Sequence, residues 1–243
     1  MMRLVRVLVA PVLLITLLIS GKSWVAGTSR GEGIEAFPPM PSDHPPGASS
    51  TSRATSTALG RGVNFGDMLD APNEGDWGLI LRDEFIHVTA QAGFTSVRLP
   101  IHWSNHTAAT APFTIAPGFL SRVESVLGKL LAKGVYVVLD MHHYRQLDGD
   151  TLDSGESAVD SAILDVRFLM IWRQIAERFR GKSNHLLLEL YNEPHGRLTP
   201  LKWNDLAARA LNVVRTSDPT RIVVHRPDKL ERPRRALVFA PSQ

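Results

Sequence analysis

From Leu59 onward, short apolar runs alternate with longer amphipathic stretches, and this alternation is the strongest constraint on the fold. The short runs are almost continuously apolar, as expected for strands buried on both faces of a parallel sheet. The long stretches place apolar residues at helical spacing and end near a glycine or a proline. The predicted strands cover residues 60–66, 96–101, 135–140, a run that starts at 186, and 221–224; the predicted helices cover residues 79–92, 117–133, 158–180 and 200–216.

Repeating strand–helix units of this size predict an α/β protein, built either as a doubly wound sheet or as a (β/α)8 barrel of the TIM type. Polar residues stand at the carboxyl ends of four predicted strands: Asn64, Arg98, His142 and the pair Asn192-Glu193. In a barrel all such ends face one mouth, whereas in an open sheet only those near the switch point meet. We therefore predict an incomplete TIM-type barrel, with about five of the eight units present.

The run that begins at Leu186 ends abruptly in Asn192-Glu193-Pro194. Pro194 cannot donate a hydrogen bond to a sheet, so the strand must stop there. A carboxyl group beside an amide at such a point can act as a general acid. The alternative is that Glu193 caps the strand in a solvated turn.

Composition narrows the choice of partners. The chain has 243 residues, 44% of them hydrophobic, which is enough for one sizeable domain. It contains no cysteine, which excludes disulfides and thiolate metal sites. Residues 221–243 hold six Lys or Arg and two Asp or Glu, so the rest of the chain carries 21 basic and 22 acidic groups. A nearly neutral body predicts no nucleic-acid partner.

The N-terminal region has the pattern of an exported protein. Arg3 and Arg6 precede an apolar run, Val7 to Ile19, that is too short to span a bilayer. We predict a signal peptide over residues 1–26 and a secreted protein. Trp24 fits a cleavage site poorly, so an uncleaved anchor at the outer face of the membrane is the alternative, and stable membrane contact is expected only in that case. Residues 27–58 are rich in Pro, Ser and Thr and predict a disordered linker.

Five segments of the chain, taken in order, resemble the successive motifs of glycoside hydrolase family 5, the cellulase-type endoglucanases. The segments are residues 61–66, 74–78, 92–101, 140–144 and 191–195. The resemblance covers residues 60 to about 224. It implies a (β/α)8 barrel and retaining hydrolysis of β-1,4-glucans without a metal or other cofactor. The implied partner is a β-linked polysaccharide or oligosaccharide.

The resemblance also implies roles for single residues. Glu193 matches the acid/base, Asn192 the residue that binds the sugar 2-hydroxyl, and Arg98 and His142 the residues that orient the nucleophile. The predicted substrate-binding residues, chosen at the mouth and for aromatic faces that stack on sugar rings, are Asn64, Trp77, Trp103, His143 and Tyr144.

Several of these residues have alternative roles. Arg98 could neutralise a buried Glu189. His143 and Tyr144 could be packing residues. His142 and His143 could bind a metal together with Asp140 and His195. Trp172 lies in an apolar helical stripe and is predicted to be core.

The nucleophile that the resemblance requires, a glutamate at the end of a seventh strand, has no counterpart here. After the fifth strand the family has a motif like Ile-Gly-Pro-x-x-Trp-Asn, whereas this chain has His225-Arg-Pro-Asp-Lys-Leu-Glu-Arg-Pro233. If these residues were encoded as CAT CGG CCC GAC AAG CTG GAA CGC CCC, reading from the second base gives Ile-Gly-Pro-Thr-Ser-Trp-Asn-Ala. We therefore interpret residues 225–243 as a non-native basic tail produced by a frameshift near Val224, which leaves residues 59–224 as a partial barrel.

These patterns predict an exported endo-β-1,4-glucanase for polysaccharide catabolism, impaired because the half that carries the nucleophile is missing. Two alternatives remain: a carbohydrate-binding remnant without catalysis, and an inactive pseudogene product.

Overall fold

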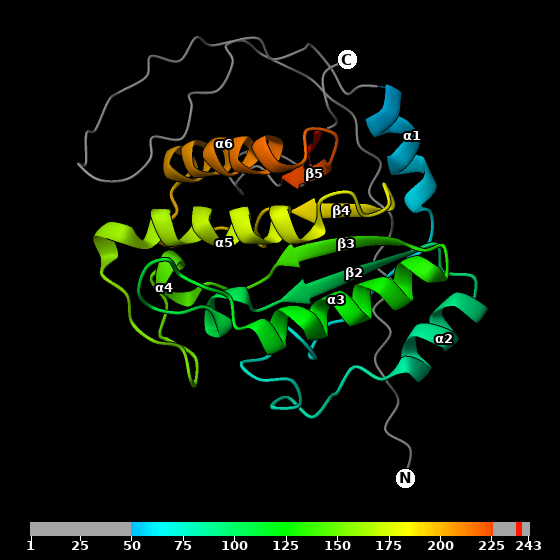
Figure 1. Ribbon diagram of the computed structural model, residues 1–243, viewed down its shortest axis with the longest axis horizontal. Coiled ribbons are helices and arrows are strands. Elements are labelled where there is room, and N and C mark those ends of the chain that lie inside the picture. Colours follow the sequence, from blue (N-terminus) through cyan, green and yellow to red (C-terminus); the bar gives the residue numbers. More distant parts are fainter. Residues whose placement is uncertain (1–49, 226–236, 240–243) are drawn as a thin grey trace.

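The computed structural model describes residues 50–225 and 237–239 (Figure 1). The predicted signal segment and residues 27–49 of the predicted linker lie outside these ranges. The helices are α1 (Ser50–Leu59), α2 (Asp83–Gln91), α3 (Pro117–Ala132), α4 (Arg145–Asp148), α5 (Leu164–Phe179) and α6 (Pro200–Ser217), with 3-10 helices η1 (Trp103–His106) and η2 (Ser161–Ile163). The strands are β1 (Gly62–Asn64), β2 (Ser96–Ile101), β3 (Tyr136–Met141), β4 (Leu186–Glu189), β5 (Ile222–His225) and β6 (Leu237–Phe239).

The strands β1 to β5 are parallel and lie side by side in chain order, and β6 pairs antiparallel with β5. A doubly wound sheet would reverse its strand order at a switch point, and the described sheet has no such reversal. The five parallel strands alternate with helices as in part of a TIM barrel, so the predicted fold class is confirmed.

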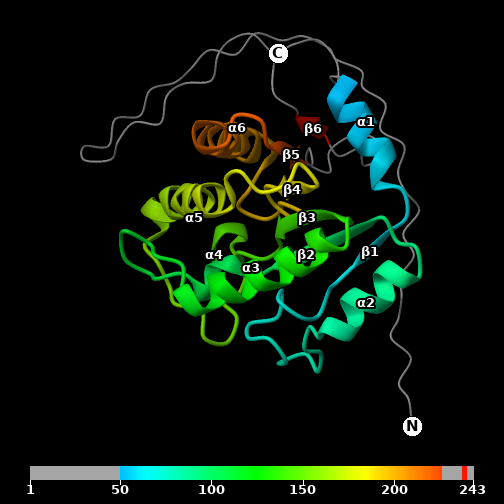
Figure 2. The same cartoon turned by 45° about the vertical axis from the view of Figure 1, so that its right-hand side comes forward.

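Alternation along the strands gives the sheet two different faces. The outer face carries residues such as Val97, Leu99, Val137 and Leu188, which belong to the main core beneath the helices. The views in Figures 1 and 2 place α3, α5 and α6 along this face. The inner face has a smaller apolar cluster formed by Leu187, Ile222 and Val224, against which Leu59, Tyr136 and Val138 pack.

Two helices begin later than predicted, and side-chain contacts explain one of these shifts. The α2 helix begins at Asp83, not at residue 79, because a carboxylate oxygen of Glu74 accepts a hydrogen bond from the backbone N–H of Leu81. Arg122 donates to the carbonyl of Leu81 and to Glu74, which holds the chain outside the helix. The α5 helix begins at Leu164, preceded by η2. The predicted ends of α3 and α6 agree with the structure to within one residue.

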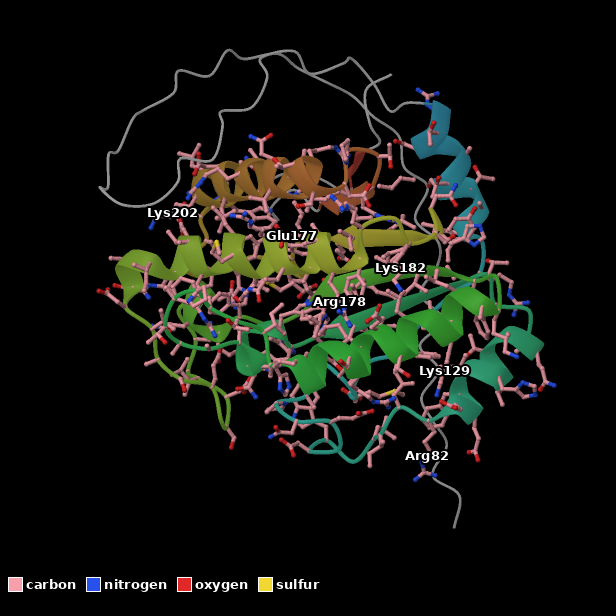
Figure 3. All side chains as sticks on the ribbon, viewed as in Figure 1. Arg82, Lys129, Glu177, Arg178, Lys182 and Lys202 are labelled. Atoms are coloured by element: carbon pink, nitrogen blue, oxygen red, sulfur yellow. The ribbon has the colours of Figure 1, made fainter. Side chains whose placement is uncertain are left out.

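Ion pairs on the outer surface link neighbouring helices, and their basic members Lys129, Arg178 and Lys182 are labelled in Figure 3. Lys129 of α3 pairs with Asp83 of α2 at 2.7 Å. Glu124 of α3 pairs with Arg178 of α5 and with Lys182 just beyond it. Because these groups are largely exposed, each pair stabilises the fold by about 1 kcal/mol or less.

Two predicted boundaries fall inside regular secondary structure. The linker was predicted to reach residue 58, but residues 50–59 form α1, which is fixed at its end because Leu59 packs on the inner face and its carbonyl accepts a hydrogen bond from Thr95. The non-native tail was predicted to start at residue 225, but His225 belongs to β5 and is buried against Trp203. Within the same predicted tail, β6 supplies backbone partners to the edge of β5.

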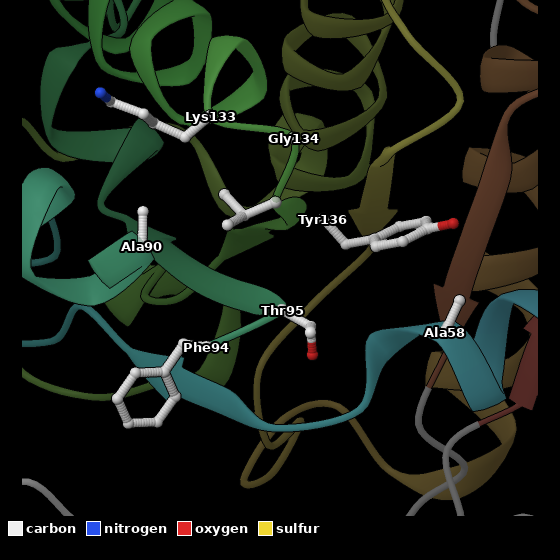
Figure 4. Close-up of a pocket in the computed structure, with 8 residues that line it drawn as sticks. Ala58, Ala90, Phe94, Thr95, Lys133, Gly134 and Tyr136 are labelled. Atoms are coloured by element: carbon white, nitrogen blue, oxygen red, sulfur yellow. The ribbon is translucent and has the colours of Figure 1, made fainter. Parts of the chain in front are cut away.

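A cavity of about 260 Å³ lies at the end of the sheet where β2 and β3 begin (Figure 4). Ala58, Phe94, Thr95 and Tyr136 contribute to its wall. Because the polar residues predicted to form a site stand at the opposite ends of the strands, this cavity is not part of that site. Within the described residues, no helix is long and apolar enough to cross a membrane.

At the same end of the sheet, Arg221 joins the two segments that precede β4 and β5. Its buried guanidinium pairs with Asp218 at 2.9 Å and donates hydrogen bonds to the backbone carbonyls of Lys182, Ser183 and Leu186. These contacts tie the segment before β4 to the segment before β5.

Replacing Arg221 with alanine should therefore lower the free energy of unfolding by about 3–5 kcal/mol, since Asp218 would be left buried without its partner. Urea unfolding followed by circular dichroism measures this. Arg209→Ala is the matched control: its pairs with Asp165 and Asp205 are exposed, and the loss should stay near 1 kcal/mol or below. Equal losses in the two variants would contradict this account.

Candidate active site

An ion cluster on the inner face lies at the centre of the candidate site. Arg98 of β2 donates from Nε to Glu189 Oε2 at 2.6 Å, and its Nη2 lies 2.7 Å from Asp140 Oδ2. The two carboxylates are almost completely buried. Burial alone would lower the pKa of Arg98, but the charges of Asp140 and Glu189 outweigh it and raise that pKa. The ion pair with Glu189 that the alternative role for Arg98 requires is present.

The remaining donors of Arg98 reach the residues around it. Its Nη2 donates to Asn192 Oδ1 at 3.1 Å and its Nη1 to Asn64 Oδ1 at 3.4 Å. Since a guanidinium only donates, Asn192 must turn its oxygen toward Arg98, and its amide nitrogen then faces away. The predicted residues Asn64, Arg98 and Asn192 do come together.

His142 joins the same network through one ring nitrogen. Its Nδ1 lies 2.7 Å from Asp140 Oδ2, and Arg98 Nη1 lies 3.4 Å from the same nitrogen. Because an ionised carboxylate only accepts, the shorter contact requires a proton on Nδ1. Burial, aided by the charge of Arg98, lowers the pKa of His142 to about 4. The ring is therefore neutral near pH 7, with the lone pair of Nε2 facing Asp70, whose Oδ2 is 4.0 Å away.

Glu193 stands where the chain leaves β4, and its backbone is in a rarely used conformation. Its φ is +44°, a left-handed value that is unfavourable for a residue with a Cβ atom. Such backbone is found where surrounding contacts enforce it, often at functional sites. The side chain of Glu193 is partly buried.

The loop that follows Glu193 is held against the segment after β3. Arg197 donates its backbone N–H to the carbonyl of Asp148 at 2.7 Å. A Cβ atom at Gly196 would lie 2.2 Å from that same carbonyl oxygen, so only glycine fits there. Asp148 also accepts a hydrogen bond from Tyr191 at 2.5 Å, although burial raises its pKa to about 6. These contacts fix the loop that presents Glu193.

Of the tryptophans and the tyrosine predicted to bind substrate, only Trp77 has an exposed side chain. Trp77 is 42% exposed, and its ring lies edge-on to His143 with centroids 6.0 Å apart. Trp103 was predicted to bind sugar, but it is fully buried because η1 folds back and packs it against Phe119 of α3. Tyr144 is also fully buried, beneath the guanidinium of Arg167. The substrate-binding predictions for Trp103 and Tyr144 are therefore wrong, whereas Trp172 is core as predicted.

The metal alternative grouped the two histidines with Asp140 and His195, whereas the structure brings a different carboxylate, Asp70, close to both of them. His142 and His143 lie with Asp70, each offering a ligand atom within 4.8 Å of the others. Asp140 contacts His142 but is also ion-paired with Arg98, and His195 lies with Asp148 and Asp150. Sequence reasoning missed Asp70 and Asp148, although both follow strands on the side of the predicted mouth.

A comparison of the sequence with models of known protein families identifies the family. The model of the family described as "Cellulase (glycosyl hydrolase family 5)" matches residues 58–230, more than half of the chain. The chain belongs to glycosyl hydrolase family 5.

Relatives in this family are longer than the matched segment. Endoglucanase H of Acetivibrio thermocellus is 39% identical over 166 residues, which cover 68% of this chain and 17% of that protein. Endoglucanase A of Ruminococcus albus is 30% identical over 59% of this chain and 40% of its own length. The structure of endoglucanase Cel5A from Thermotoga maritima superposes with a TM-score of 0.65 at 41% identity, over 71% of this chain and 52% of that one. This chain thus spans about half of that solved family 5 structure.

His142 and His195 should titrate at well-separated pH values. At pH 6 we expect His142 to be neutral, because burial holds its pKa near 4, and His195 to be largely charged, because the carbonyl of Glu193 raises its pKa. Since the pKa of His142 lies below its usual 6.5, its contribution to stability is lost as the pH falls from about 6.5 toward 4. Imidazole ¹⁵N chemical shifts measured against pH give the pKa of each histidine, and the variants His142→Asn and His195→Asn assign the signals. Titration of His142 near pH 6.5 would contradict the buried network.

Proposed function

We propose that this chain carries the acid/base half of a retaining β-1,4-glucanase site, with Glu193 as the proton donor. The observation that carries the proposal is the position of Glu193: strained, beside Asn192, and at the same strand ends as the cluster of Arg98. Retaining hydrolysis needs one carboxyl group that protonates the leaving oxygen and later deprotonates water. The relatives described above are endoglucanases by name, which supports the same reaction class.

The network around Glu193 supplies oriented partners for a sugar. Because Arg98 holds the oxygen of Asn192, the amide nitrogen of Asn192 is left to donate to a sugar hydroxyl. The Nε2 lone pair of neutral His142 can accept from a second hydroxyl. Cel5A of Thermotoga maritima has been solved with cellobiose and with mannotriose, which supports a β-linked oligosaccharide as the ligand here.

The retaining reaction also needs a second carboxylate that acts as the nucleophile. The two carboxylates beside Arg98 are those of Asp140 and Glu189. Both are buried and ion-paired with Arg98, so neither is placed as a nucleophile. We therefore propose that residues 50–225 alone turn over β-glucan very slowly or not at all. We also propose that the protein acts outside the cell, where a polymeric substrate is found.

Glycan binding without hydrolysis is the second candidate function, and the exposed Trp77 favours it. Its ring stands edge-on to His143, which places an aromatic face beside the wall of the site. An aromatic face of this kind stacks on a pyranose ring without any catalytic carboxylate.

The reaction is tested by release of reducing sugar from soluble β-glucan. We expect none above background from the chain as it stands, and hydrolysis from the polypeptide encoded by the shifted frame. Glu193→Gln in the latter should lower kcat/KM by roughly 10³-fold. The same substitution should lower the rate of the first step less for an aryl cellobioside than for β-glucan, because the aryl leaving group needs no proton. Glu177→Gln, on the outer face of α5 (Figure 3), is the matched control and should change neither rate.

Two outcomes would reject parts of this proposal. Glu193-dependent hydrolysis by the unaltered chain would show that one of its own carboxylates is the nucleophile. An active shifted-frame polypeptide that tolerates Glu193→Gln would remove Glu193 from the reaction.

Binding is tested separately by calorimetry with cellotetraose. Trp77→Ala should weaken binding by about 1–2 kcal/mol, roughly 5- to 30-fold in Kd, through loss of stacking. Ile80→Ala is the matched control, since Ile80 is also exposed in this loop. Equal effects of the two substitutions would show that Trp77 does not contact the sugar.

A further inference from the structure

Behind the wall of the candidate site lies a second group of polar side chains that the proposed reaction does not use. It consists of His102, just after β2, and of Asp153 and Glu156, in the segment between α4 and η2. Each offers one ligand atom, and the three atoms lie within 4.8 Å of one another. His102 Nε2 is 3.9 Å from Asp153 Oδ2.

His102 is the unusual member of this group. Its side chain has no solvent exposure, and neither of its ring nitrogens has a hydrogen-bond partner among the described residues. A buried polar group without a partner costs free energy, so such a group points to a ligand that completes it. One of its two nitrogens is aimed at the carboxylate of Asp153.

The two carboxylates are held in place by other residues. Ser104 donates to Glu156 Oε1 at 2.9 Å, and Arg145 donates from Nε to Asp153 Oδ2 at 2.7 Å. Contacts of this kind orient the ligands of a metal ion from outside. The charges of Arg145 beside Asp153 and of Arg167 near Glu156 oppose a cation, and the two carboxylates offset them. The coordinate bonds themselves would then supply the affinity.

We propose that His102, Asp153 and Glu156 bind a divalent transition-metal ion of the zinc type. One imidazole nitrogen and two carboxylate oxygens form a donor set that Zn²⁺ accepts, whereas Ca²⁺ and Mg²⁺ prefer oxygen ligands alone. Tetrahedral zinc places its ligand atoms about 3.3 Å apart, so binding would draw the segment of Asp153 and Glu156 slightly toward β2.

Such an ion would support the wall of the candidate site without entering it. The ring of His102 meets that of His143 edge-on, with centroids 5.6 Å apart, and Ser104 lies within 3.4 Å of the carbonyl of His143. The ion would join the end of β2 to the segment after α4, and its role would be structural. It is independent of whether the chain hydrolyses glucan.

The test is a zinc titration of the purified full chain without a histidine tag, stripped with a chelator and measured in competition with a chromophoric zinc indicator. We expect one equivalent of Zn²⁺ to bind and the midpoint of thermal unfolding to rise with Zn²⁺. Replacing zinc with Co²⁺ should give visible absorption bands typical of a tetrahedral site with nitrogen and oxygen ligands.

The variants separate this site from the two other groups of possible ligands. His102→Gln and Asp153→Asn should each weaken the one-equivalent binding at least 100-fold and remove the Co²⁺ bands. His195→Gln and Asp70→Asn, each in one of the other groups, should leave both unchanged. If His102→Gln does not fold, the partly exposed Asp153 still provides the test.

The proposal is overturned if the unaltered chain binds no zinc. It is also overturned if Asp153→Asn keeps full affinity, or if His195→Gln or Asp70→Asn abolishes the binding instead.

Discussion

The structure depends above all on the cluster of one guanidinium and two carboxylates inside the sheet. Arg98, Asp140 and Glu189 come from β2, β3 and β4, and the register places Asp140 level with Glu189 and two residues beyond the partner of Arg98. Burying charges is costly unless each finds its partner, so the arrangement tolerates little displacement. Slipping β2 by one residue would turn Arg98 toward the apolar outer face, where Val97 and Leu99 pack. The cluster therefore fixes the register of three strands.

The same cluster also orders the mouth. A guanidinium offers only donors, and a carboxylate only acceptors, so the groups that touch them can take only one orientation. Asn192 must present its oxygen to Arg98, and His142 must present a protonated Nδ1 to Asp140. The loop of Glu193 is fixed from the other side by Asp148 through Gly196 and Tyr191. Side chains from four strands are thus oriented before any ligand arrives.

Sequence patterns predicted the parts of this arrangement that depend on local spacing of residues. They did not predict the parts that depend on the path of the connecting segments. The bounds of β2 were predicted at residues 96–101, as observed, and Asn64, Arg98, His142 and Asn192 meet because strand ends in a barrel share one mouth. The failures lie in the segments that connect a strand to the next helix. Whether Trp103 faces solvent depends on η1 folding back onto α3, which no residue near Trp103 reveals. The start of α2 depends on Glu74 and Arg122, of which Arg122 is distant in sequence.

The charge balance of the inner face agrees with the chemistry proposed for it. Arg98 carries one positive charge against the two negative charges of Asp140 and Glu189, and His142 stays neutral because burial lowers its pKa to about 4. The cluster is therefore one charge negative at the strand ends where a sugar would sit. Cleavage of a glycosidic bond passes through a state like an oxocarbenium ion, in which the sugar gains positive charge. Fixed charges aimed at a site of charge development stabilise it without reorganisation. In the proposed reaction, the cluster that holds three strands together would therefore also favour that cation.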